Sequence, residues 1–522
     1  MTLKNIIASI CLGVSALQAV PLAASDEQYR PAFHYAPQHN WMNDPNGMVY
    51  LDGEYHLFYQ YNPYGHAWGP MHWGHAVSRD LRNWQELPIA LYPDQLGTIF
   101  SGSAVFDKHN TSGLGSKENP PLVAIYTYNH QFREHQSLPT GQSQALAYSL
   151  DKGRSWQKYA HNPVLTNPAE RDFRDPKVFW FAAGNKWIMS LAVDRKISFY
   201  SSKNLRDWHH ESDFGEGVGV KDGVWECPDL IPLRIEGSDV QKYVLLVSIN
   251  PGAVNGGSGT QYFVGDFDGK TFQLDAQFSA QLQQKSQQGE SPAEWLDYGA
   301  DNYAGVTWSN LPDGRALMIG WMNNWDYAQI TPLKTWRGAM TLPRELSLVQ
   351  SNGRYLLRSV PAREVAGHLQ KKIALTPTNI SGSYELLSAQ GVKEFPQYVQ
   401  LQFAQPVAGK VEVSLGAGRE QTRLIIDGEK QQVLFDRNQS GLVKFSDKFT
   451  GVQRAPFNNQ QGSLKLELFI DKSSLEIFIN DGELVFTNQI FPTQFVSPKK
   501  PREILIKTNN PLQLSAASLG YF

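Results

Sequence analysis

The sequence predicts an all-β protein, a β-propeller followed by a β-sandwich. Short runs of aromatic and β-branched residues recur between Gly, Pro, Asn and Asp residues, and helical periodicity is scarce. A turn followed by Trp is repeated in the first part of the chain, whereas apolar and polar residues alternate strictly in the last part. The repeat predicts the propeller, and the alternation predicts the sandwich.

The chain begins with the features of an export signal. Lys4 precedes an apolar stretch over residues 6–20, and small residues at 23–25 then precede a polar run. The apolar stretch is too short for a transmembrane helix and is interrupted by polar residues. We therefore expect a cleaved signal peptide over residues 1–25 and an exported protein, either periplasmic or secreted.

The repeated turn organises the first part of the chain. It appears as SRDLRNW at 78–84, SLDKGRSW at 149–156 and SSKNLRDW at 201–208. In each copy a polar turn joins two strands and the aromatic residue packs beneath it. Recurrence at intervals of roughly 50 to 70 residues is typical of propeller blades. Three unrelated hairpins are the alternative, and we expect the propeller to cover residues 26–360.

The alternation becomes strict after the propeller. Val399, Leu401 and Phe403 alternate with polar residues, and the pattern returns at 464–468 and 475–479. One buried face and one solvated face describe an antiparallel sandwich. We expect this sandwich over residues 361–522.

Composition limits the ligands. The net charge is −3, and Lys and Arg residues are dispersed, which argues against nucleic acid or an anionic membrane as a partner. The chain contains 14 Trp and 22 Tyr residues, more than a core alone usually needs. Because sugars stack on aromatic faces, a neutral carbohydrate is the favoured ligand.

Three motifs carry carboxyl groups. They are WMNDPNG at 41–47 with Asp44, FRDP at 173–176 with Asp175, and WECPD at 225–229 with Glu226. Taken alone, the WMNDPNG motif could also be a simple turn, and Asp175 in FRDP could form a surface ion pair. Retaining glycoside hydrolysis needs a nucleophilic carboxylate and a second carboxyl group that protonates the leaving oxygen. Asp44 and Glu226 are candidates, since the inner strands of a propeller converge on one end of its channel.

The three motifs, in this order, resemble the signature blocks of glycoside hydrolase family 32, the invertases, inulinases and levanases. Four further segments are similar to segments of that family: FSGS (100–103), DNYA (301–304), WRGAMTLPREL (336–346) and DKSSLEIFINDGE (471–483). The resemblance covers nearly the whole mature chain. It implies a five-bladed propeller followed by a sandwich.

The resemblance also implies roles. Asp44 would be the nucleophile, Glu226 the general acid/base and Asp175 the transition-state stabiliser. Seven further positions match residues that line the fructose pocket in the family: Asn43, Gln60, Trp68, Phe100, Ser101, Arg174 and Trp321. The sequence departs from commoner members at Phe100, where many carry Trp.

Two segments, GTQYFVGDFDG at 259–269 and WMNNWDYA at 321–328, look more like exo-acting inulinases and levanases than like sucrose-restricted invertases. The predicted function is therefore a retaining exo-hydrolase that releases terminal β-D-fructofuranosyl units from fructans (levan or inulin) and from sucrose. An invertase restricted mainly to sucrose and short oligosaccharides is one alternative, and a non-catalytic fructan-binding protein is another. A sialidase, also a propeller, would need an arginine cluster and a tyrosine nucleophile in place of Asp44.

No metal or cofactor is predicted. His72 and His75 lie close together in the sequence, but no third ligand follows at a suitable spacing. Packing or hydrogen bonding is the favoured interpretation of both histidines.

Overall fold

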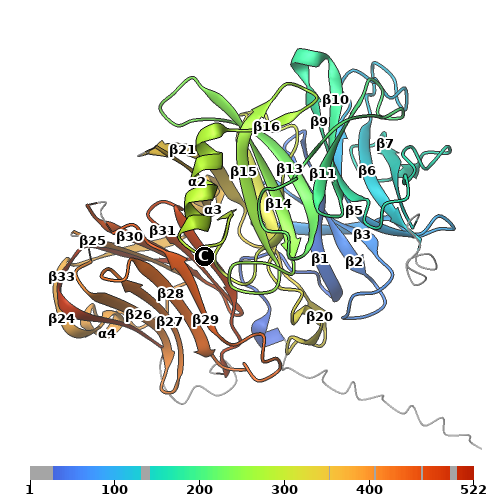
Figure 1. The fold of residues 1–522 in the computed structure, drawn as a ribbon. Helices are drawn as coiled ribbons and strands as arrows, with labels where there is room; N and C mark the ends of the chain where they lie inside the picture. Colours follow the sequence, from blue (N-terminus) through green and yellow to red (C-terminus); the bar gives the residue numbers. More distant parts are fainter. Residues whose placement is uncertain (1–26, 131–140, 352, 405–406, 460–461, 494–501) are drawn as a thin grey trace, which may run out of the picture.

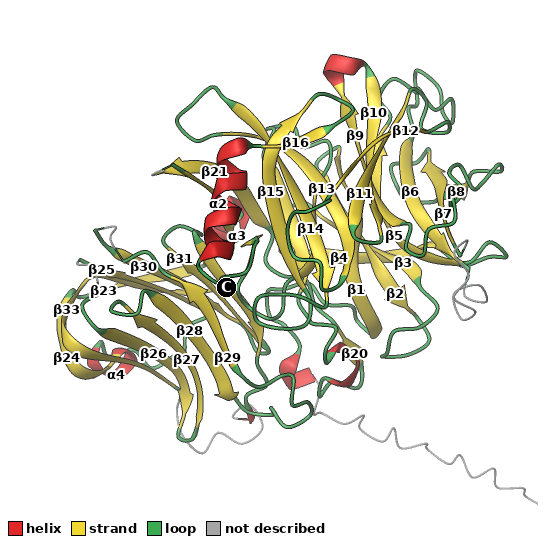
Figure 2. Cartoon of the chain, viewed as in Figure 1, coloured by secondary structure: helices red, strands yellow, loops and turns green. Residues whose placement is uncertain are grey.

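The computed structural model describes residues 27–130, 141–351, 353–404, 407–459, 462–493 and 502–522. The expected signal peptide over residues 1–25 lies outside the described residues. Strands dominate the described chain, and they form five small sheets grouped as a propeller and one large sheet beside it (Figures 1 and 2). The predicted fold class, a five-bladed propeller followed by a sandwich, is confirmed.

Each blade is an antiparallel meander. The first contains β1 (Asn40–Leu51), β2 (Glu54–Asn62), β3 (His72–Ser78) and β4 (Trp84–Leu91). The second contains β5 (Thr98–Phe106), β6 (Leu122–Asn129), β7 (Gln142–Ser149) and β8 (Gln157–Lys158). The third contains β9 (Arg174–Phe181), β10 (Lys186–Val193), β11 (Lys196–Ser202) and β12 (His209–Phe214).

The last two blades follow the same plan. The fourth contains β13 (Val224–Arg234), β14 (Gln241–Asn250), β15 (Gly259–Phe267) and β16 (Phe272–Leu274), with β17 (Glu294–Trp295) paired to β15. The fifth contains β18 (Tyr303–Thr307), β19 (Ala316–Trp321), β21 (Arg344–Ser351) and β22 (Arg354–Pro361). A short strand, β20 (Trp336–Arg337), leaves the fifth blade to pair in parallel with β1. This pairing ties the last part of the propeller to the first.

The repeated turns have one structure in three blades. Trp84, Trp156 and Trp208 each donate an indole hydrogen bond to the carbonyl three residues earlier, at 3.2, 3.1 and 2.8 Å. The accepting residues are Leu81, Gly153 and Leu205, and all three have left-handed backbone, with φ of 64°, 84° and 63°. The repeat is therefore a structural unit and not a set of unrelated hairpins.

The C-terminal sheet has eleven strands. They are β23 (Lys371–Leu375), β24 (Thr378–Glu385), β25 (Tyr398–Phe403), β26 (Lys410–Ala417), β27 (Glu420–Asp427), β28 (Gln432–Gln439), β29 (Val452–Pro456), β30 (Leu464–Ile470), β31 (Ser474–Ile479), β32 (Leu484–Gln489) and β33 (Glu503–Tyr521). The long strand β33 pairs with β26 through its first part and with β25 through its last part. It therefore joins both halves of the sandwich. The alternating residues Val399, Leu401 and Phe403 are fully buried, as the pattern predicts.

Helices are few among the described residues. The α-helices are α2 (Ala276–Gln287), α3 (Arg363–Gly367) and α4 (Leu386–Ala389), and the 3-10 turns are η1 (Glu27–Tyr29), η2 (Ala182–Gly184) and η3 (Ala328–Ile330). Helix α2 begins at the N-cap Asp275, whose carboxylate accepts from two backbone N–H groups, and it packs against β15 and β22. Within the described chain, no helix combines the length and the apolar character needed to cross a membrane.

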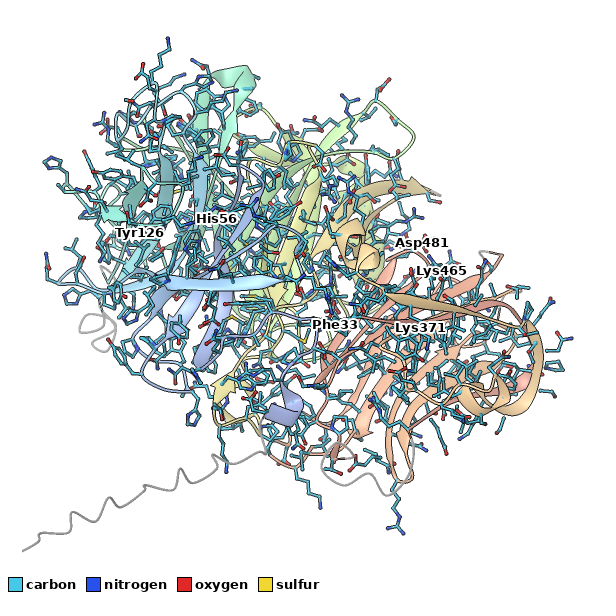
Figure 3. The ribbon with its side chains drawn as sticks, turned by 180° about the vertical axis from the view of Figure 1, so that it is seen from behind. Phe33, His56, Tyr126, Lys371, Lys465 and Asp481 are labelled. Atoms are coloured by element: carbon cyan, nitrogen blue, oxygen red, sulfur yellow. The ribbon has the colours of Figure 1, made fainter. Side chains whose placement is uncertain are left out.

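The two ends of the described chain meet where the propeller and the sandwich join. Phe33 lies at this junction (Figure 3), and its ring stacks on that of Phe522 with centroids 4.3 Å apart. The backbone N–H groups of Ala32 and Phe33 donate to the Asp471 carboxylate of the sandwich, at 2.7 and 3.1 Å. The segment before β1 therefore binds the two parts together.

Candidate active site

The innermost strands of the five blades carry matching β-bulges. Strands β1, β5, β9, β13 and β18 lie side by side around the channel. The pairing register shifts between Met42 and Pro45, between Ile99 and Gly102, between Arg174 and Lys177, between Glu226 and Asp229, and between Tyr303 and Val306. In each case the inner strand holds one extra residue. Because a bulge bends the strand and redirects its side chains, the five strands present the motif residues at one end of the channel.

Three of these bulges contain non-glycine residues with left-handed backbone. Asp175, Cys227 and Ala304 have φ values of 62°, 47° and 52°. Such a conformation costs roughly 1 to 3 kcal/mol per residue, so it persists only where the surrounding structure imposes it. Asp175, and Cys227 directly after Glu226, thus have a backbone conformation that their surroundings impose.

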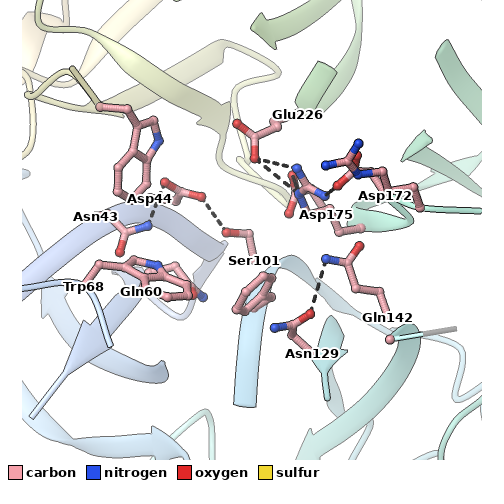
Figure 4. Close-up of a pocket in the computed structure, with 15 residues that line it drawn as sticks. Asn43, Asp44, Gln60, Trp68, Ser101, Asn129, Gln142, Asp172, Asp175 and Glu226 are labelled. Carbon is pink, nitrogen blue, oxygen red and sulfur yellow. Dashed lines mark hydrogen bonds and ion pairs between the residues drawn. The ribbon is translucent and has the colours of Figure 1, made fainter. Parts of the chain in front are cut away.

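The acids open into one pocket of about 330 Å³. Figure 4 shows Asp44, Asp175 and Glu226 converging there from three blades. The pocket is lined by Asn43, Asp44, Gln60, Trp68, Phe100, Ser101, Asn129, Gly141, Gln142, Arg171, Asp172, Arg174, Asp175, Glu226 and Trp325. Every site residue named from the sequence lines it except Trp321.

Trp321 lies behind the residues that line the pocket. Trp321 is completely buried and packs between Trp41 and Trp325, with ring centroids 5.8 and 4.8 Å away. Trp325, four residues later, presents its ring to the pocket instead. The chain turns after β19, so the second tryptophan covers the first. Phe100 forms another part of the wall beside Trp68.

Asp44 is held by neutral donors on both oxygens. Ser101 Oγ donates to Oδ2 at 2.7 Å, and Asn43 Nδ2 donates to Oδ1 at 3.0 Å. Asn43 is itself fixed, because its Oδ1 accepts from Trp41 Nε1 at 2.7 Å. Burial raises the pKa of Asp44, and the charge of Glu226 adds to this effect, while the two hydrogen bonds oppose it. The carboxylate is therefore oriented by neutral groups, and none of the described residues places a cation directly against it.

Glu226 lies between a cation and a phenol. Arg174 donates to its Oε1 from Nη2 at 3.0 Å and from Nε at 3.2 Å, and Tyr303 Oη donates to Oε2. Burial and the charge of Glu226 raise the pKa of Tyr303 well above its usual value, so Tyr303 acts as a neutral donor. Arg174 also pairs with Asp172. One arginine thus serves two carboxylates at the pocket wall.

Asp175 is held by a backbone N–H group of the WECPD motif. Its Oδ2 accepts from the Cys227 backbone N–H at 3.1 Å and lies 3.9 Å from Arg174 Nε. Burial raises the pKa of Asp175, and the Arg174 guanidinium opposes this rise. The Cys227 thiol lies 3.7 Å from both Asp44 Oδ2 and Asp175 Oδ2. Burial raises the pKa of this thiol well above its usual value, so a neutral group separates the two acids.

The channel is filled beyond the acids. Further along the same inner strands, Lys177 Nζ lies 3.0 Å from Asp229 Oδ2 and donates to the Thr307 carbonyl at 2.5 Å. All three residues are buried. This buried ion pair joins inner strands of the third and fourth blades further along the channel than the acids.

Several lining residues had no role in the sequence prediction. Asn129 ends β6 and Gln142 begins β7, and Gln142 Nε2 donates to Asn129 Oδ1 at 3.4 Å. Neither lies in a distinctive motif, so only the pairing of β6 with β7 reveals them. Arg171 and Asp172 lie just before FRDP, and Trp325 lies within WMNNWDYA. Their closeness to these motifs is the feature of the sequence that could have indicated them as pocket residues.

The two neighbouring histidines make ordinary polar contacts. His75 Nε2 lies 3.1 Å from His56 Nδ1, and His72 Nδ1 donates to the Pro70 carbonyl at 2.8 Å. Burial lowers the pKa of His56 to about 4. Burial also lowers the pKa of His75 well below its usual value. In the part of the chain that the structure describes, no cluster of three or more His, Cys, Asp or Glu side chains is arranged to hold a metal ion.

A propeller that brings three carboxyl groups together in a polar pocket with aromatic walls has the site of a glycoside hydrolase. Comparison with known proteins gives the family. Residues 34–359 match the family model described as the glycosyl hydrolases family 32 N-terminal domain, and residues 364–510 match the model of the C-terminal domain. The chain belongs to glycosyl hydrolase family 32, and the resemblance read from its motifs is confirmed.

Individual relatives cover most of the chain. A levanase of Bacillus subtilis is 46% identical over 477 residues, which are 90% of this chain and 67% of that protein. An extracellular exo-inulinase of Aspergillus awamori is 40% identical and aligns with 93% of this chain and 94% of its own length. The crystal structure of exo-inulinase from Aspergillus awamori superposes with a TM-score of 0.82 at 38% identity, covering 95% of this chain and 98% of that one. The structure of β-fructofuranosidase from Schwanniomyces occidentalis, complexed with fructosyl-erythritol, superposes with a TM-score of 0.80 at 31% identity. The match covers 94% of this chain and 97% of that one.

Proposed function

We propose that this protein is a retaining exo-hydrolase that releases terminal β-D-fructofuranosyl units from levan or inulin and from sucrose. The observation that carries the proposal is the single pocket that Asp44, Asp175 and Glu226 all line. The names of the relatives, levanase, exo-inulinase and β-fructofuranosidase, support fructosides as the substrates.

In the first step an Asp44 oxygen attacks the anomeric carbon of the fructosyl unit. The bond to the leaving oxygen breaks, and that oxygen takes the proton of Glu226. Asn43 and Ser101 keep the Asp44 carboxylate oriented for attack. Arg174 and Tyr303 both donate to Glu226, so they stabilise the carboxylate that forms when its proton leaves.

In the second step Glu226 removes a proton from water, and the water oxygen attacks the anomeric carbon while Asp44 departs. Asp175 contacts ring hydroxyls and stabilises the positive charge that develops in both transition states. Its fixed position, supported by the Cys227 N–H, suits a residue that binds the sugar without bonding to it.

We infer exo action from the buried groups that lie beyond the acids in the channel. The Lys177–Asp229 pair fills the space beyond the acids, so a chain end can enter the pocket but an internal unit has no path past it. A hydroxyl that is free in a terminal unit is committed to a linkage in an internal unit. Losing one such hydrogen bond costs about 1 to 3 kcal/mol, roughly tenfold to a hundredfold in rate.

Products at low conversion test this function. Digests of inulin, levan and sucrose should contain free fructose, with no early oligosaccharides from the polymers, when they are separated by chromatography. Early short oligosaccharides would contradict exo action. Rapid sucrose cleavage with intact polymers would favour the invertase alternative, and sugar binding without cleavage would favour a non-catalytic binding protein.

The anomer released first tests the retaining mechanism. Double displacement predicts that fructose appears initially in the β configuration, because two inversions at one carbon restore its geometry. Proton NMR during early turnover distinguishes the anomers. Initial release of the α anomer would exclude Asp44 as a nucleophile.

We also propose that the protein is exported and that the propeller and the sandwich occupy residues 26–360 and 361–522. Relatives described as extracellular support export. The end of β22 at Pro361 and the start of β23 at Lys371 support the boundary. N-terminal sequencing of the protein recovered outside the cytoplasm should begin near residue 26, whereas retention of residues 1–25 would contradict cleavage.

A further inference from the structure

A buried arginine of the sandwich reaches the segments that form the pocket. Arg437 lies on β28 and is 1% exposed. Its Nη1 donates to Asp301 Oδ2 at 2.5 Å, and its Nη2 donates to Tyr327 Oη at 2.7 Å. Tyr327 Oη in turn donates to Asp301 Oδ1 at 2.5 Å. The three side chains form a closed ring across the junction of propeller and sandwich.

The sandwich fixes Arg437 from behind. Its Nε donates to the Phe449 carbonyl at 2.9 Å, and its guanidinium lies 3.7 Å above the Phe449 ring. Gln489, on β32, reinforces the same contact, since its N–H donates to Asp301 Oδ2 at 2.8 Å and its Nε2 donates to the Met322 carbonyl at 2.5 Å. Arg437 is therefore fixed by contacts within the sandwich as well as by its two partners in the propeller.

Both propeller partners lie two residues from groups that form the site. Asp301 precedes Tyr303, which donates to Glu226. Tyr327 follows Trp325, which lines the pocket and packs against the buried Trp321. A shift of Asp301 or Tyr327 therefore displaces either the donor to the general acid or the aromatic wall that faces the sugar.

We propose that Arg437 is a positioning residue for the active site and that the sandwich acts through it to hold Trp325 and Tyr303 in place. This role rests on the proposed function, because it assumes that the pocket binds a fructosyl unit. It gives the second domain a part in substrate binding without any contact between that domain and the sugar.

The alternative is that Arg437 only stabilises the junction. The same junction offers a matched control, the buried pair of His34 and Asp471. Their side chains are fully buried, and His34 Nδ1 lies 2.8 Å from Asp471 Oδ2. This pair anchors the segment before β1, which lies apart in sequence from Tyr303 and Trp325. Asp471→Asn therefore weakens the junction at a different point.

The experiment compares Tyr327→Phe, Arg437→Lys and Asp471→Asn in the full chain, at a temperature where thermal unfolding shows each to be folded. We measure kcat and KM with sucrose and the inhibition constant Ki of free fructose, because KM and Ki do not depend on the amount of active enzyme. Tyr327→Phe and Arg437→Lys should raise KM and Ki about three- to tenfold, as expected for a loosened wall. Asp471→Asn should lower Tm and leave both constants unchanged.

Unchanged KM and Ki in the Tyr327 and Arg437 variants would overturn the proposal, as would an equal rise in Asp471→Asn. If Arg437→Lys does not fold, Tyr327→Phe decides alone, since it removes one hydroxyl and keeps the ring and the Arg437–Asp301 pair. Failure of the wild-type protein to hydrolyse any fructoside would instead contradict the proposed function.

Discussion

The pocket and the junction between the domains both bury charged groups, but they balance them differently. At the junction, Arg344 is fully buried between Asp297, at 2.9 Å, and Glu476, and His34 lies between Asp471 and Glu476 at 2.8 Å from each. In the pocket, Arg174 pairs with Asp172, Asp175 and Glu226, whereas Asp44 is bound by neutral donors, and all four carboxyl groups line open space. Every carboxyl group named at the junction contacts a cation directly, whereas the pocket has one arginine in contact with three carboxyl groups and a fourth that is bound only by neutral groups.

The pKa shifts follow this difference. At the junction, hydrogen bonds and charges that oppose the cost of burial lower the pKa of Glu476 to about 2 and raise that of His34 to about 9. In the pocket, burial prevails and raises the pKa of Asp44 and of Asp175. Paired charges stabilise the fold, whereas unmatched carboxyl groups are kept ready for substrate.

The largest expected effect comes from removing the nucleophile. Asp44→Asn should lower kcat with sucrose and inulin about 10⁴-fold or more, because no neighbouring group can form the covalent intermediate. Its Tm should stay equal or rise, since the substitution removes a poorly compensated buried charge. Turnover and thermal unfolding are measured together. Activity within tenfold of wild type would contradict the role of Asp44.

A smaller effect is expected for the general acid. Glu226→Ala should lower kcat about 10²- to 10⁴-fold with sucrose but much less with a fructoside whose leaving group needs no protonation. The ratio of the two losses is the measurement. Equal losses with both substrates would show that Glu226 does not act as the acid.

Arg344, unlike Arg437, should affect stability and not substrate binding. Arg344→Met leaves Asp297 buried without its cation and Glu476 with His34 alone, so the free energy of unfolding should fall by about 3 to 5 kcal/mol. Denaturant titration measures the fall. KM for sucrose should remain close to the wild-type value, and a rise comparable to that of the pocket variants would remove the contrast between the two regions.

The smallest expected effect is a pH dependence of stability. Because the folded-state pKa of His34 is raised from 6.5 to about 9, its contribution is fully present below pH 6.5 and is lost as the pH rises through 9. Over this range the free energy of unfolding should fall by up to about 3 kcal/mol. Glu476, with a lowered pKa, contributes above pH 4.5 and loses its contribution as the pH falls through 2. His34→Gln should abolish the alkaline slope, and a slope that survives would assign it to another group.

Local patterns in the sequence were enough to predict the strands, the repeated turns and the alternating buried and exposed faces of the sandwich. Trp84, Trp156 and Trp208 mark their turns because each hydrogen bond joins residues three positions apart. Asp44 and Glu226 could be singled out as candidate acids because they and their neighbours form motifs that can be recognised without knowing the fold.

Tertiary structure decided what lies around these acids. Trp325 rather than Trp321 faces the pocket because the chain turns after β19. Tyr303 meets Glu226, and Asn129 and Gln142 line the pocket, only because separate strands pair in a particular register. The direction of a side chain at a bulge depends on how the neighbouring strand pairs. A buried carboxylate such as Asp301 needs a cation nearby, and its partner Arg437 is 136 residues away in the sequence. Neither relation can be inferred from the local order of residues.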